Sequence, residues 1–118
     1  MTEIEAIELA RAYVALSNAH RVDLIEPMFA EDAVYYSSAV GEYRGAESIS
    51  EMMQAFFARY PDAFWLTEDY QYASNRVSFS FSLQAIDTQS GNPLQRMGIE
   101  HIEFDARTRI KKLEVQAS

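Results

Sequence analysis

Apolar residues recur at helical spacing in the first fifth of the chain and again near its middle. Residues 4–18 and 46–60 each carry an apolar stripe with a period of three to four residues, which predicts two amphipathic helices. Residues 22–29 are predicted to form a shorter second helix, which Pro27 weakens because it lacks a backbone N–H. Ser48 and Glu51 have the spacing of a capping box near the start of the third helix.

Most of the remaining chain alternates between apolar and polar residues, which is typical of strands with one buried face. Residues 76–87 alternate almost perfectly, with serines on the polar side. Five strands are predicted, over residues 33–38, 64–73, 76–87, 94–105 and 109–116. Residues 41–45 and 88–92 are predicted loops, and Ser74-Asn75 a tight turn.

The expected order is α-α-β-α-β-β-β-β, which places the chain in the α+β class. The last four strands follow one another without helices, so they are expected to form an antiparallel meander. We expect one domain over residues 1–118, in which a curved antiparallel sheet wraps over the helices as a cone and leaves a cavity between the two layers.

One strand of this meander carries a carboxylate among apolar neighbours. Alternation places Glu100 on the same face as Gly98, Ile102 and Phe104. A carboxylate on an apolar face must be solvated, paired or protonated, because an unpaired buried charge is costly. Glu100 therefore either meets water at the rim of the sheet or is a neutral acid inside it. Tyr13 poses a related problem, since its phenol lies within the apolar arc of the first helix.

Composition narrows the function classes. The net charge is −8, so binding of nucleic acid through a basic face is not expected. There is no cysteine, no apolar run long enough for a membrane span and no signal-peptide pattern, so a cytoplasmic location is the default expectation. Two histidines far apart in sequence do not predict a metal site, and no cofactor-binding motif is present.

Three stretches resemble the nuclear-transport-factor-2-like (NTF2-like, cystatin-like) superfamily, which includes ketosteroid isomerases and SnoaL-like polyketide cyclases. Residues 11–19 resemble the first helix of the isomerases, with Tyr13 at their oxyanion-hole tyrosine. Residues 28–34 resemble their entry into the first strand, and residues 99–104 the strand with a protonated aspartic acid, where this chain has Glu100. The resemblance implies a cone-shaped α+β fold and a homodimer.

The resemblance also implies the chemistry of the isomerases, but the chain lacks a residue that matches their base. In the isomerases a tyrosine and a neutral carboxylic acid donate hydrogen bonds to a developing enolate oxygen, and a separate aspartate moves the proton. Tyr13 and Glu100 take the first two roles here. The position of the base falls at Ser37, which cannot act as a carboxylate, and Glu42 in the following loop is the alternative.

Three functions stay open at this point. The chain is a cofactor-independent isomerase-, cyclase- or lyase-like enzyme with Tyr13 and Glu100 as catalytic donors, a non-catalytic binding module for a small hydrophobic molecule with a polar group, or an interaction domain with a filled cavity. The predicted ligand-binding residues are Ser37 and an apolar wall of Met52, Phe56, Phe79, Phe81, Leu83, Leu113 and Val115.

Overall fold

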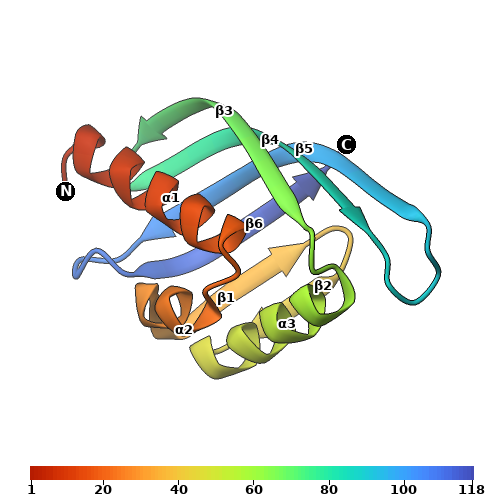
Figure 1. Ribbon diagram of the computed structural model, residues 1–118. Helices are drawn as coiled ribbons and strands as arrows, with labels where there is room; N and C mark the ends of the chain where they lie inside the picture. The colour runs from red at the N-terminus through yellow and green to blue at the C-terminus, as the bar shows by residue number, and fades with distance from the viewer.

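Three α-helices and six strands make up the protein, which a computed structural model describes over residues 1–118 (Figure 1). The helices are α1 (Glu3–Asn18), α2 (Val22–Ile25) and α3 (Ala46–Arg59), and a 3-10 turn, η1 (Glu26–Met28), follows α2. The strands are β1 (Phe29–Ser37), β2 (Gly41–Arg44), β3 (Phe64–Ala73), β4 (Arg76–Ile86), β5 (Pro93–Phe104) and β6 (Ile110–Ala117).

The strands form one open sheet in the order β2-β1-β6-β5-β4-β3. The predicted α+β class is confirmed, with two corrections. Residues 41–45 are not all loop, because Gly41–Arg44 pairs with β1 as an antiparallel hairpin. The sheet is mixed rather than antiparallel throughout, because β1 runs parallel to β6. A four-residue exposed strand shows too little alternation to be recognised in the sequence.

The helices cover one face of the curved sheet, so that α1 packs against β3 and α3 against β1 (Figure 1). The capping box lies at the start of α1, where Thr2 and Glu5 exchange hydrogen bonds, and not at Ser48 and Glu51. Instead α3 follows Gly45, whose φ of 92° suits glycine, without a side-chain cap. None of the helices is long and apolar enough to cross a membrane.

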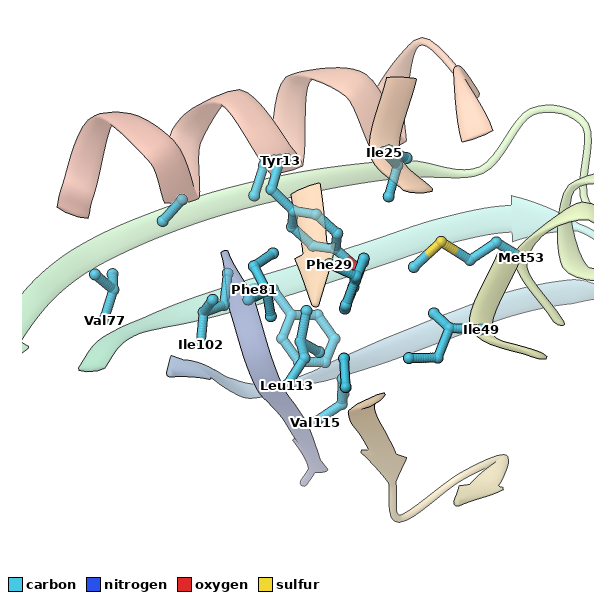
Figure 2. Packing of buried hydrophobic residues seen from close by; sticks show 14 of the residues in the cluster. Tyr13, Ile25, Phe29, Ile49, Met53, Val77, Phe81, Ile102, Leu113 and Val115 are labelled. Atoms are coloured by element: carbon cyan, nitrogen blue, oxygen red, sulfur yellow. The ribbon is translucent and has the colours of Figure 1, made fainter. Parts of the chain in front are cut away.

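Side chains from both layers meet in one core, which Figure 2 shows between α1, α3 and the sheet. The alternation along β4 and β5 is preserved, since the inner-face residues of β4 from Val77 to Ala85 and of β5 from Gly98 to Phe104 are buried. The serines of β4 alternate with this buried row and are half-buried on the other face.

Two polar contacts hold the helices in place around the core. At the end of α1, Asn18 pairs with the backbone of Trp65, donating to its carbonyl at 3.0 Å and accepting from its N–H at 2.7 Å. At the end of α3, Arg59 donates two hydrogen bonds to the Asp87 carboxylate, at 3.0 and 2.7 Å. These contacts fix Trp65 and the outer end of α3 relative to the sheet, and with them one wall of the site.

Candidate functional site

A cavity lies between α1, α3 and the inner face of the sheet. Its volume is about 60 Å³. The lining is mostly apolar and aromatic, and consists of Tyr13, Val14, Ser17, Tyr35, Ser37, Val40, Met52, Met53, Phe56, Phe57, Trp65, Phe81, Leu83, Arg96, Glu100 and Val115.

Glu100 reaches the cavity from the inner face of β5. Its cross-strand neighbours are apolar, Phe79 on β4 and Val115 on β6, and the residue is only 5 % exposed. Its carboxyl group forms no ion pair or hydrogen bond within the chain, and burial raises its pKa from 4.5 to about 8. The side chain is therefore a neutral acid at pH 7, and a neutral carboxyl group can donate a hydrogen bond.

Tyr13 enters the same cavity from α1. Figure 2 shows its side chain extending from the helix into the space above the sheet, and its ring meets that of Phe29 edge-on at 6.0 Å. Burial raises the pKa of Tyr13, and the nearby Tyr35 and Glu100 raise it further. The phenol stays protonated at neutral pH and is a second hydrogen-bond donor beside Glu100.

Tyr35 and Arg96 add polar groups to the lining, and neither was predicted from the sequence. Burial raises the pKa of Tyr35, Glu100 raises it further, and Arg96 opposes this rise. Alternation could have found the two residues, because Tyr35 shares a strand face with Ser37 and Arg96 shares one with Glu100.

Most of the side chains predicted to form the site line this cavity. Tyr13, Glu100 and six others are there, namely Ser37, Met52, Phe56, Phe81, Leu83 and Val115. Phe79 and Leu113 are not, because they pack inside the core away from the cavity, where Phe79 stacks on Tyr70 at 4.7 Å. Alternation assigns a residue to the inner face of a strand, but it does not show where along that face the helices leave a gap.

No second carboxylate lines the cavity. Ser37 is buried at 3 % exposure, and its hydroxyl accepts a hydrogen bond from the Ala39 N–H at 3.2 Å. Glu42 lies on exposed β2, where it pairs with Arg44 at 3.0 Å, and it does not line the cavity. No group of three or more histidine, cysteine, aspartate or glutamate side chains is placed to hold a metal ion.

The arrangement presents two neutral donors, Tyr13 and Glu100, at an otherwise apolar site. Such a pair binds an acceptor oxygen, and binds it more tightly as negative charge develops on that oxygen. The apolar walls favour a ligand with a largely hydrocarbon body, since burial of its surface is the main source of affinity.

Comparison with known proteins gives a family match and a set of structural relatives. The SnoaL-like domain family matches residues 10–112. No curated protein sequence is significantly similar to the chain.

Three solved structures illustrate the shared fold. The epoxide hydrolase/cyclase-like enzyme SalBIII of salinomycin pyran-ring formation has a TM-score of 0.87 at 13% identity, over 98% of this chain and 92% of that one. A candidate SnoaL-like polyketide cyclase from Shewanella denitrificans OS-217 has a TM-score of 0.82 at 19% identity, over 96% of this chain and 90% of that one. An NTF2-like protein of unknown function from Exiguobacterium sp. 255-15 has a TM-score of 0.79 at 13% identity, over 99% of this chain and 98% of that one. The predicted superfamily is thereby confirmed.

Proposed function

The chain belongs to the SnoaL-like domain family, and from this premise we propose that it binds a small, largely apolar molecule carrying a carbonyl or phenolic oxygen. That oxygen accepts hydrogen bonds from Tyr13 and Glu100, and the body of the molecule lies against the aromatic walls. The observation that carries the proposal is the pairing of two buried, neutral donors in one apolar cavity.

The physical state of Glu100 supports an oxyanion-type role. An ionised carboxylate would repel an electron-rich oxygen, whereas the protonated acid attracts it. With a pKa of about 8, Glu100 is mostly protonated at pH 7. A donor that is already in place and shielded from water is the kind of group that stabilises an enolate, and its contribution in enzymes is often large.

The lining also bears on whether the bound molecule reacts. The sequence resemblance assigns Ser37 to the position of the isomerases' base, and no ionised carboxylate lines the cavity. Isomerisation by a protein base is therefore disfavoured. The two roles compatible with this lining are binding without turnover and a cyclase- or lyase-like reaction in which the substrate supplies its own basic group. Neither role requires a metal or an organic cofactor.

A homodimer is the second part of the proposal, and the outer face of the sheet supports it. Leu66, Met97 and Ile99 are exposed there and line a groove beside Ser80 and Ser82. Exposed apolar side chains grouped in this way are typical of protein contacts. Sedimentation equilibrium would test this part, because a dimer has twice the 13.5 kDa of one chain.

Binding of 2-naphthol, a two-ring phenol, tests the ligand proposal by isothermal titration calorimetry. We expect wild type to bind it, and we expect Tyr13→Phe and Glu100→Leu each to weaken binding by roughly 2- to 10-fold, the usual effect of losing one hydrogen bond. Tyr36→Phe is the matched control, since Tyr36 is the neighbour of Tyr35 but does not line the cavity. Wild-type affinity in both cavity variants, or no binding by wild type, would overturn the proposal.

A further inference from the structure

We propose that the ligand is an organic anion, whose carboxylate pairs with Arg96 at one end of the cavity while its carbonyl or phenolic oxygen meets Tyr13 and Glu100 at the other. This inference rests on the proposed function, because it names the chemical class of the molecule held in the same site.

The position of Arg96 on β5 separates it from the two donors. Arg96 and Glu100 share the inner face of the strand with Gly98 between them, so about 13 Å of strand divides their backbones. Arg96 pairs with Leu83 of β4, and the pairing of β5 with β6 starts only at Gly98. The Arg96 side chain therefore leaves the strand at the end of the cavity that β6 does not cover. Gly98 adds no side chain between Arg96 and Glu100, and the backbone of β6 at Gln116 and Ala117 lies where its Cβ would stand.

Arg96 is also free of partners within the chain. Five of the eight arginines are paired with carboxylates, namely Arg21, Arg44, Arg59, Arg76 and Arg109. Arg11 lies over the ring of Tyr70 at 4.2 Å. Arg96 forms no ion pair, side-chain hydrogen bond or ring contact in a chain with 18 acidic residues. Its planar group of five N–H donors is available to a carboxylate, which it can bind with two parallel hydrogen bonds.

The charge balance of the lining favours an anion. Glu100 is neutral at pH 7 and the tyrosines are neutral, so Arg96 gives the cavity a charge of +1 inside a protein of net charge −8. Arg96 is half-buried, and the apolar walls beside it lower the local dielectric and strengthen its attraction for an anion. A cationic ligand would find no ionised carboxylate in this lining.

A pair of matched probes tests the inference. 6-Hydroxy-2-naphthoic acid has a phenol and a carboxylate at opposite ends of two fused rings, and its methyl ester has the same body without the charge. By calorimetry at pH 7 and low salt, we expect wild type to bind the acid roughly tenfold more tightly than the ester, the scale of one charge-assisted hydrogen-bonded pair. High salt should reduce this preference, because Arg96 is partly exposed.

Substitutions then assign the preference to its residue. Arg96→Gln should remove the preference for the acid, because both probes then face an uncharged side chain, and Arg96→Lys should retain part of it. Arg107→Gln is the control, because it removes one arginine charge from an exposed turn outside the cavity and should change neither affinity. Circular dichroism would establish that each variant is folded.

The outcomes separate this inference from the proposal on which it rests. If wild type binds acid and ester equally, or if Arg96→Gln keeps the preference, the anion inference is wrong while binding through Tyr13 and Glu100 stands. If neither probe binds to wild type, the proposed function fails and the anion inference fails with it. If Arg107→Gln removes the preference as Arg96→Gln does, the effect is one of net charge and the assignment to Arg96 is overturned.

Discussion

Glu100→Gln should remove a fall in stability that the wild-type protein shows as the pH rises. Glutamine has nearly the same shape and still donates a hydrogen bond, but it does not ionise. In wild type the folded state keeps its proton up to a pKa of about 8, whereas the unfolded chain loses it near 4.5. Between these values the folded state binds more protons than the unfolded state, so the free energy of unfolding decreases with pH.

The size of the effect follows from the separation of the two pKa values. One pKa unit corresponds to about 1.4 kcal/mol, so the full shift of Glu100 from 4.5 to about 8 amounts to about 5 kcal/mol. A domain of this size is typically stable by about 5–15 kcal/mol, so the loss is a large part of the total. Below pH 4.5 the burial of this group does not lower the free energy of unfolding through ionisation. Above about pH 8 the lowering has reached its full value and no longer changes with pH.

Urea unfolding of wild type and Glu100→Gln across the pH range measures this difference. Trp65 is the single tryptophan and lines the cavity, so its fluorescence reports on the same region. Because the chain has a pI of about 4.6, the series should begin near pH 5.5, from which we expect the variant to gain about 3 kcal/mol over wild type by pH 8. A difference between the two proteins that stays constant with pH would refute a neutral, buried Glu100.

Two further predictions concern single positions on the strands. Ser37→Asp should place a base in the cavity and produce isomerisation of 3-cyclohexenone, measured by absorbance, because positioned acid–base catalysis is worth about 10²–10⁴-fold in rate. Adding Tyr13→Phe should remove most of the gain. A folded but inactive Ser37→Asp protein would limit the likeness to the isomerases to the scaffold. Gly98→Ala should lower the free energy of unfolding by about 1–3 kcal/mol, because the added Cβ would press on the Gln116 carbonyl and lie 2.9 Å from the Ala117 Cα. If Gly98→Ala unfolds in urea as wild type does, β6 moves to admit the added Cβ without a loss in the free energy of unfolding, and the prediction is wrong.

The sequence predicts the larger elements well because their patterns are long. All three helices and the strands β3 to β6 are recognised from periodicity, and the inner face of β5 is assigned correctly through Glu100. The short strand β2 is missed, since four exposed residues have no buried face to reveal them. The parallel pairing of β1 with β6 is missed because periodicity carries no information about which strands become neighbours.

The site is predicted less completely, because the sequence does not show which inward-facing residues border the cavity. Alternation predicts that Phe79, Phe81 and Leu83 point inward, but it does not show that Phe79 stacks on Tyr70 while the other two line the cavity. The sequence does not reveal the role of Arg96 for a related reason. A charged residue near the end of a strand is usually solvated, and only the absence of a partner in three dimensions makes its position informative.

The parallel seam between β1 and β6 also determines the order in which the protein can assemble. Hairpins between sequence neighbours can build β3 to β6 early, but Tyr35 meets Leu113 only after most of the chain has come together, and such distant pairings form slowly. The cavity takes Tyr35 and Ser37 from one side of this seam and Val115 from the other, so it is absent until the seam closes. A molecule bound there contacts residues of both β1 and β6. It therefore stabilises the pairing of these two strands, which completes the folding of the chain.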